Sequence, residues 1–64
     1  MQLMKHKVVN ADGAHITTVI TNDSPDMLDK ASAKIKHMFP QGYPFLKIES
    51  SIPYTDMTRG QWND

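Results

Sequence analysis

The stretch VVNADGAHITTVIT, residues 8–21, decides the fold of this chain of 64 residues. Its valines, isoleucines and threonines suit the pleated surface of a sheet. They lie on both sides of Asp12-Gly13, a dipeptide typical of tight turns between strands. Residues 2–21 therefore predict a β-hairpin.

The pairing register of this hairpin depends on the length of its loop. A loop of two residues, Asp12-Gly13, would place Lys5 opposite Ile20 and put lysines on the apolar face. A loop that also includes Ala11 places Met4 opposite Ile20, and it puts Gly13 where a bulged turn needs a left-handed residue. Because a slip of one residue inverts every side chain, the apolar pattern should decide. We expect the three-residue loop.

This register gives the hairpin two different faces. The face expected to meet the core carries Met4, His6, Val8, Ile16, Thr18 and Ile20. The opposite face, mixed in character, carries Leu3, Lys5, Lys7, Val9, His15, Thr17 and Val19.

The next segment predicts an amphipathic helix over Pro25–Met38. Ser24 is a favourable N-cap, and Pro25 suits the first helical position, where no N–H is needed. Apolar residues then recur at helical spacing, and Pro40 stops the helix. The apolar stripe consists of Leu28, Ala31, Ile35 and Met38, widened by Met27 and Phe39.

Residues Phe45–Ile52 predict a third strand, which Pro53 ends or marks as an edge. One face of this strand is expected to carry Leu46, Ile48, Ser50 and Ile52, and the other Phe45, Lys47, Glu49 and Ser51. The chain then reads as a single α+β domain of β-β-α-β type over residues 1–53, with a polar tail over residues 54–64. The sheet is expected to be three-stranded, antiparallel or mixed. Two strand orders are possible. We favour the order 2-1-3, with the helix over the central strand, over an order in which the third strand lies beside the second. One helix covers one face of such a sheet.

Composition limits the possible functions. The absence of cysteine excludes disulfides and thiolate zinc sites, and seven Lys/Arg balance seven Asp/Glu, so no overall field favours nucleic acid or anionic membranes. The first residues contain no apolar run of the length that a signal peptide or a membrane span needs. We expect a cytoplasmic protein with no membrane association.

No pattern in the sequence indicates catalysis or a cofactor. The three histidines are too scattered for a metal site, and Asp26 and Asp29 are explained by the positive end of the helix dipole. Since no nucleophile motif or phosphate loop is present, we expect neither enzymatic activity nor a bound cofactor or metal. His6, on the core face, should need a hydrogen-bond partner.

The candidate partner-binding residues lie on the uncovered sheet face and in the tail. Tyr54 and Trp62 are of the types favoured at interface hot spots, and we expect Trp62 to pack back on the domain. A small domain with one open face would gain burial from a second copy, so a homodimer is expected. The candidate residues are Lys5, Lys7, Val9, Val19, Phe45, Lys47, Tyr54 and Trp62.

These features favour a small non-enzymatic binding protein, a regulator or inhibitor that occupies a surface of another protein. In size and composition the chain resembles the small accessory proteins that bacteriophages and mobile elements make to block host factors, although no motif carries this likeness. The alternative is a nucleic-acid-binding module that uses Lys5, Lys7, Lys47 and Phe45 on the open face.

Overall fold

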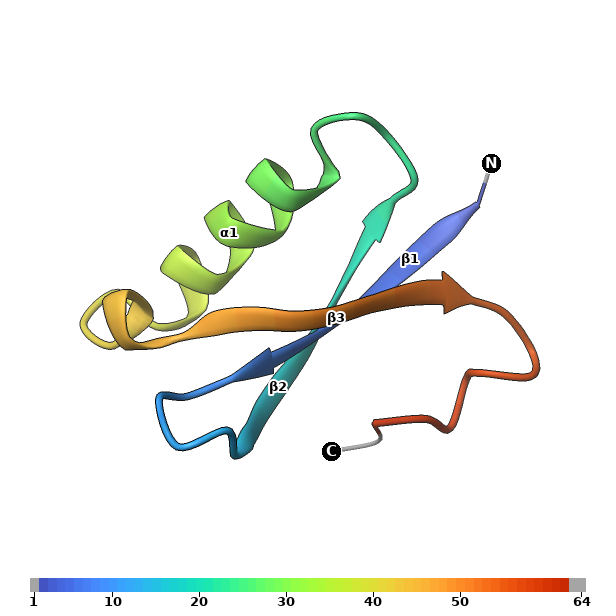
Figure 1. Ribbon diagram of the computed structural model, residues 1–64. Coiled ribbons are helices and arrows are strands. Elements are labelled where there is room, and N and C mark those ends of the chain that lie inside the picture. Colours follow the sequence, from blue (N-terminus) through green and yellow to red (C-terminus); the bar gives the residue numbers. More distant parts are fainter. Residues whose placement is uncertain (1, 63–64) are drawn as a thin grey trace.

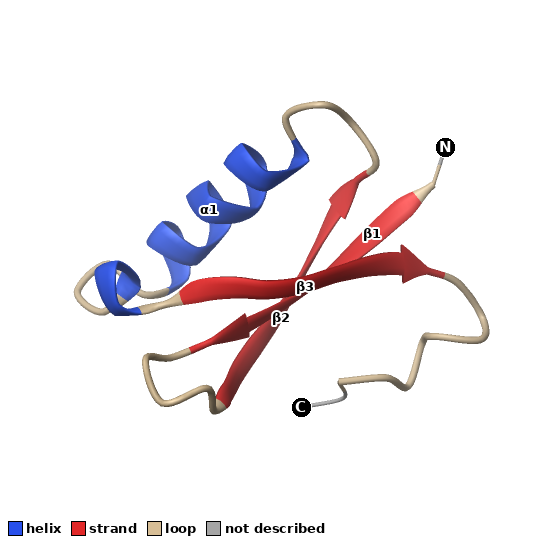
Figure 2. Ribbon diagram, viewed as in Figure 1, coloured by secondary structure: helices blue, strands red, loops and turns tan. Residues whose placement is uncertain are grey.

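The computed structural model describes residues 2–62, so Met1 and Asn63–Asp64, at the ends of the expected domain and tail, lie outside the described residues. The elements follow in the predicted β-β-α-β order (Figure 2). They are β1 (Leu3–Val9), β2 (His15–Asn22), α1 (Met27–Met38), the short 3-10 helix η1 (Tyr43–Phe45) and β3 (Lys47–Tyr54).

The three strands form one sheet in the order β2-β1-β3, and both pairings are antiparallel. This confirms the α+β class and the strand order 2-1-3. The helix lies on one side of the sheet, and the C-terminal segment turns back on the other (Figure 1). Both outer strands are therefore edges, one on each side of β1.

The turn between β1 and β2 is the three-residue loop that the sequence predicts. The Asn10 side-chain oxygen accepts hydrogen bonds from the backbone N–H groups of Asp12 and Ala14 at 2.9 and 3.0 Å. Gly13 has φ 83°, a conformation that costs a side-chain-bearing residue free energy. The N–H of Asn10 donates to the carbonyl of Ala14 and closes the loop at 3.1 Å.

The predicted register does not extend beyond the turn. Val9 pairs with His15, but Val8 pairs with Thr17, so that Ile16 is an extra residue in a β-bulge. From there on the strands follow the rejected register, in which Lys5 lies opposite Ile20. The extra residue at the bulge exchanges the two faces of β2 from Thr17 onward. The predicted faces are therefore right for β1 and wrong for this part of β2. The β2 side chains toward the helix are Thr17, Val19 and Thr21, and those on the opposite face include Thr18 and Ile20.

A second bulge lies on the other side of β1. Val8 pairs with Ile48 and Lys7 with Ser50, which leaves Glu49 as the extra residue of β3. The predicted alternation in the third strand is therefore wrong after Ile48. Ser51 lies on the helix side with His6, and Ile52 lies opposite Lys5 on the other face. Pro53 stands within β3, as the edge-strand alternative predicts, because an edge residue can do without its N–H.

The helix begins at Met27 and not at Pro25. The preceding residues form a turn in which the Met27 N–H donates to the Ser24 carbonyl at 3.1 Å. The Ser24 hydroxyl donates to the Asp26 carboxylate at 2.7 Å, so it does not cap the helix as predicted. The helix ends at Met38, as predicted from Pro40.

The core lies between α1 and the sheet. Val8, Val19, Ala31 and Ile35 are its buried residues, and Phe39, Leu46 and Ile48 pack against them. The helix packs most closely against β2, whereas the sequence predicted it over the central strand. One result is that β3, on the far side of β1, is left partly uncovered.

Gly13→Ala should lower the free energy of unfolding by roughly 1 to 2 kcal/mol, because alanine is strained at a positive φ. Urea denaturation followed by circular dichroism measures the change. Gly42→Ala is the matched control, since Gly42 has φ −100° and an added Cβ would meet nothing within 4 Å. Equal losses in the two variants would contradict the account of the turn.

Candidate functional site

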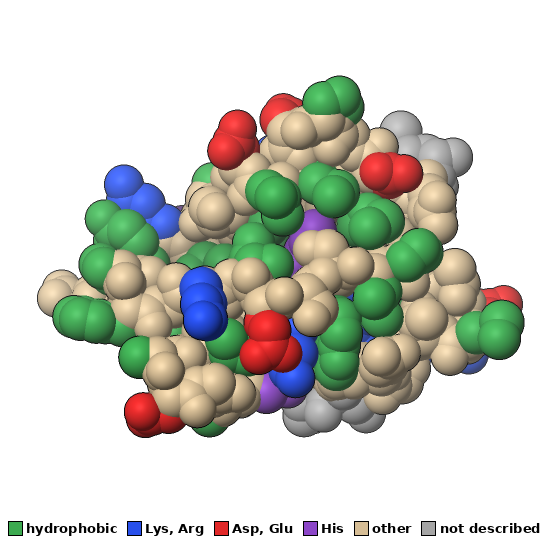
Figure 3. Space-filling model, viewed as in Figure 1, with side chains coloured by type: hydrophobic (Ala, Val, Ile, Leu, Met, Phe, Trp, Pro, Cys, Tyr) green, Lys and Arg blue, Asp and Glu red, His purple; other side chains and the backbone are tan. Residues whose placement is uncertain are grey.

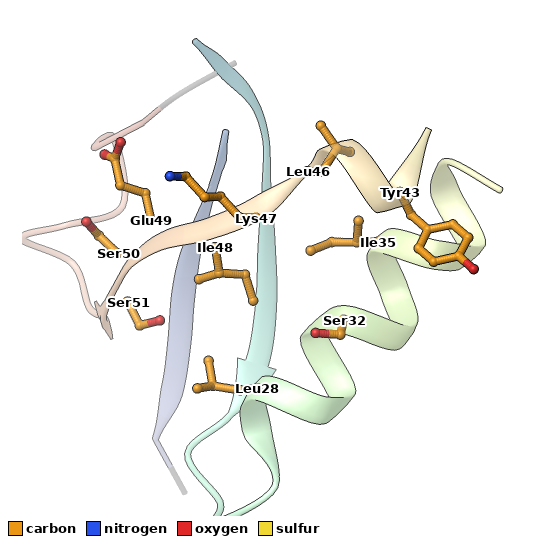
Figure 4. A pocket seen from close by; sticks show the side chains of 10 residues that line it. All are labelled: Leu28, Ser32, Ile35, Tyr43, Leu46, Lys47, Ile48, Glu49, Ser50 and Ser51. Atoms are coloured by element: carbon orange, nitrogen blue, oxygen red, sulfur yellow. The ribbon is translucent and has the colours of Figure 1, made fainter. Parts of the chain in front are cut away.

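A groove of about 430 Å³ runs between α1 and β3. Leu28 and Ile35 of α1 and Ile48 of β3 direct their side chains into it (Figure 4). Tyr43 and Leu46 lie at one end, and Ser32, Ser50 and Ser51 supply hydroxyl groups. Lys47 and Glu49 also line the groove, which is thus mostly apolar but carries several polar positions.

The groove is open to solvent along its length. Leu28 is 51% exposed although it belongs to the apolar stripe of the helix, and Tyr43 is 37% exposed. Figure 3 shows hydrophobic side chains gathered over the region where α1 and β3 face each other. A small domain that leaves such side chains in water has surface available for contact.

The outer edge of β3 is protected at its C-terminal end only. The Thr58 hydroxyl donates to the Pro53 carbonyl at 2.7 Å, so the Pro53 backbone points away from β1. Because backbone direction alternates along a strand, Ser51 presents its N–H and carbonyl to the same outer side. Within residues 2–62 no side chain hydrogen-bonds to the backbone of residues 47–51.

The edge of β2 is protected in its middle. The Lys34 ammonium reaches from α1 and donates to the Ile20 carbonyl at 2.6 Å. Near the start of β2 the bulge at Ile16 interrupts the regular backbone pattern. Charged side chains and bulges are common devices against unwanted strand pairing. β3 also has a bulge, at Glu49, and carries the charged side chains of Lys47 and Glu49. Among the described residues, however, no side chain bonds to its backbone over residues 47–51, so we take the groove half of β3 as the less protected edge.

His6 joins all three strands beneath the helix. It is fully buried, its Nδ1 lies 2.7 Å from the Ser51 hydroxyl, and its Nε2 lies 2.7 Å from the Thr21 hydroxyl. The sequence predicted one hydrogen-bond partner for His6, and the structure provides two. Burial, with a smaller contribution from the positive charge of Lys34, lowers the pKa of His6 below its ordinary value of 6.5.

A serine beside a histidine also invites comparison with a nucleophile and its base. A base needs its positive charge stabilised after it takes a proton, and a carboxylate commonly does this. Here the group behind His6 is the Thr21 hydroxyl, and the nearby charge of Lys34 opposes an imidazolium. The arrangement therefore suits a structural link between strands. That the protein is not an enzyme and holds no cofactor stays a prediction.

The C-terminal segment covers the sheet face opposite the helix. The Lys5 ammonium, on a side chain 4% exposed, donates to the carbonyls of Thr58 and Arg59 at 3.2 and 3.3 Å, and to that of Gln61. It also lies 5.7 Å from the centre of the Tyr54 ring. The face predicted to be open is thus closed by its own tail.

Three of the predicted partner-binding residues are buried. Val19 is 3% exposed and lies under α1, because the bulge inverts β2. Val9 is fully buried and Lys5 nearly so, on the face that the tail covers. None of the three side chains is accessible to a partner in this conformation.

The other predicted residues are scattered. Lys7 pairs with Glu49 at 3.2 Å, and Lys47 is exposed at the start of β3. Phe45 is 72% exposed, but it lies in η1 and not in a strand of the sheet. The half-buried Trp62 accepts a hydrogen bond from the Thr18 hydroxyl on its carbonyl at 3.1 Å, which fits the expected return of the tail.

Sequence reasoning missed the groove. Leu28 and Ile48 read as ordinary core residues, and Ser51 was assigned to the wrong face because the bulge at Glu49 has no clear signature. One usable signal was the small residue Ala31 in the centre of the helix stripe. A fully buried alanine lets the helix approach one strand closely, and a helix held there leaves the opposite edge strand uncovered.

Comparisons with protein-family models, curated proteins and solved structures found no match to this chain. Within residues 2–62, no helix has the length and apolar character needed to cross a membrane. The same residues contain no cluster of three or more histidine or acidic side chains that could hold a metal ion. The function must therefore be inferred from the groove, the edge and the tail.

The lowered pKa of His6 gives stability a defined pH dependence. The unfolded chain binds a proton near pH 6.5, whereas the folded chain binds it at a lower pH. The free energy of unfolding should therefore fall as pH decreases below 6.5, and level off below the folded pKa. Urea titrations between pH 7.5 and pH 5 test this.

The control for that experiment is His6→Gln, which keeps a donor and an acceptor but does not titrate in this range. His15 and His37 are common to both proteins, so the difference between the two curves isolates His6. Identical slopes in both proteins would show that His6 is not the group responsible.

Lys5→Met should release the C-terminal segment, because three carbonyls lose their donor. Since hydrogen bonds to a charged group are worth roughly 1.5 to 3 kcal/mol, trypsin should cleave after Arg59 at least about tenfold faster. Mass spectrometry of timed digests measures the rate. Lys47→Met, at an exposed lysine, is the control and should leave this rate unchanged; equal acceleration in both would refute the role of Lys5.

Proposed function

We propose that this chain is a small binding protein that takes up an extended segment of another protein along β3. The observation that carries the proposal is that the β3 edge beside the apolar groove has no side chain bonded to its backbone over residues 47–51 among the described residues. A segment added there would pair its backbone with β3 and place alternate side chains in the groove.

The backbone pairing would be short. Pro53 lacks an N–H and its carbonyl is engaged by Thr58, so pairing is restricted to residues 47–52. This range is about the length of an ordinary strand. It supports register-specific recognition of one segment, while the small interface places the complex among transient ones.

The groove would supply selectivity for apolar side chains. Leu28 is half exposed and lies across the groove from Ile48, so an apolar side chain between them would remove both from water. Complete burial of one such side chain contributes about 1.5 to 3 kcal/mol. This gain offsets part of the cost of ordering the segment, which is roughly 1 to 2 kcal/mol per residue for the backbone.

The structure favours protein over nucleic acid as the partner. The nucleic-acid alternative depended on lysines on an open sheet face. Lys5 now binds backbone carbonyls of the tail, and Lys7 pairs with Glu49. Of the three lysines, Lys47 alone stays available within the described residues, which is few for phosphate binding.

The broader role is proposed on the same basis. By holding a strand or extended segment of a larger protein, the chain would regulate or inhibit it in the cytoplasm, as an accessory protein of a bacteriophage or mobile element would. A second copy could use the same β3 edge, so the homodimer stays a prediction; light scattering at several concentrations tests it.

A selection from a displayed library of random nine-residue peptides tests the proposal. We expect enriched peptides with apolar residues at alternate positions. In NMR titrations the corresponding synthetic peptides should shift amide signals of residues 47–52 and of the groove side of α1. Leu28→Glu should weaken binding at least about tenfold, because it places a charge in the groove.

Met38→Glu is the matched control, since Met38 is 49% exposed on the same helix but does not line the groove. It should leave the affinity unchanged. Peptides that shift the signals of β2 or the tail, or that bind the two variants equally, would refute the proposal. Tight salt-dependent binding of single-stranded oligothymidine would favour the nucleic-acid alternative.

A further inference from the structure

We infer that Ser51 determines which ligands the groove accepts, because its hydroxyl can accept a hydrogen bond from a ligand but cannot donate one. The groove would then select an apolar group that carries a neutral O–H or N–H donor. This inference rests on the proposed function in taking the groove as the binding site.

Ser51, His6 and Thr21 form a chain of hydrogen bonds, and the direction of these bonds depends on Thr21, the group farthest from the groove. The Thr21 hydroxyl donates to the carbonyl of Asn22 at 3.2 Å. A hydroxyl has one hydrogen, so with that hydrogen on the Asn22 carbonyl the same oxygen accepts from its other close neighbour, His6 Nε2, at 2.7 Å. In this arrangement, which is part of the inference, Nε2 of His6 carries the ring proton.

The same logic continues to the groove. A neutral imidazole has one N–H, so with the proton on Nε2 the Nδ1 atom of His6 accepts a hydrogen bond from the Ser51 hydroxyl at 2.7 Å. Burial and Lys34 keep the ring neutral by lowering its pKa. The Ser51 hydrogen is thus committed inward, and its oxygen offers lone pairs to the groove.

The other lining groups complete the specificity. Leu28, Ile35 and Ile48 are apolar, and besides Ser51 the lining residues that carry a hydroxyl are Ser32, Ser50 and Tyr43. A carboxylate at the Ser51 position would meet lone pairs without a donor, so anionic groups are disfavoured there. A phenol is the simplest matching ligand, and in a protein segment this corresponds to a tyrosine side chain.

The tautomer of His6 is a direct test that needs no ligand. Long-range 15N–1H correlation spectra of the labelled protein at pH 7.5 should show Nε2 protonated and Nδ1 unprotonated. A proton on Nδ1 would overturn the inference, because Ser51 would then be free to donate into the groove.

Phenol and anisole provide matched ligand probes, since they share the ring and differ in the donor. In NMR titrations phenol should shift the amide signals of Ile48 and Ser51 at about three- to tenfold lower concentration than anisole, the range expected for one neutral hydrogen bond. Ser51→Ala should abolish the difference, whereas Ser32→Ala, in the opposite wall, should preserve it.

Equal affinities for the two probes, a preference that survives in Ser51→Ala, or failure of both probes to reach the groove would overturn the inference. The peptide experiments with Leu28→Glu and Met38→Glu remain independent of these outcomes. Peptides that bind at β3 without any preference at Ser51 would leave the proposed function standing and remove only the role of Ser51.

Discussion

The hydrogen bonds of His6 hold the structure together at its centre. One imidazole on β1 reaches a hydroxyl on each neighbouring strand, with both distances at 2.7 Å and no exposure to solvent. A buried ring with two satisfied nitrogens fixes the lateral alignment of strands whose registers are otherwise interrupted by bulges. The same ring orients Ser51, so the link that stabilises the sheet also defines a polar position of the groove.

The sequence was sufficient for the elements and their order, and insufficient for the faces of the outer strands. The turn at Asn10 and Gly13 and the end of α1 follow from local preferences, which is why they were predicted well. The bulges at Ile16 and Glu49 depend on how both outer strands fit β1, so no local pattern announces them. The groove is built on the part of β3 that contains the bulge. Because the register of this strand was predicted incorrectly, the candidate site was not predicted either.

The two faces of the sheet differ in the way they are covered. On one face a regular helix packs through small and branched side chains such as Ala31 and Ile35. On the other face, an irregular segment is held by hydrogen bonds from a single ammonium group, that of Lys5. Among the described residues this ammonium group forms no ion pair with a carboxylate. The first kind of cover depends on apolar area and the second on one polar centre, so they should respond differently to salt and to denaturants.

The position of β1 has a consequence for the order of folding. β1 lies at the start of the described chain and pairs with β3 near its end. The carbonyls that accept hydrogen bonds from Lys5 are also more than fifty residues away in the sequence. A contact of such separation forms only after the intervening chain has closed into a loop, at an entropic cost. The hairpin can therefore form early during synthesis, but its buried lysine and histidine are satisfied only after the last strand has emerged.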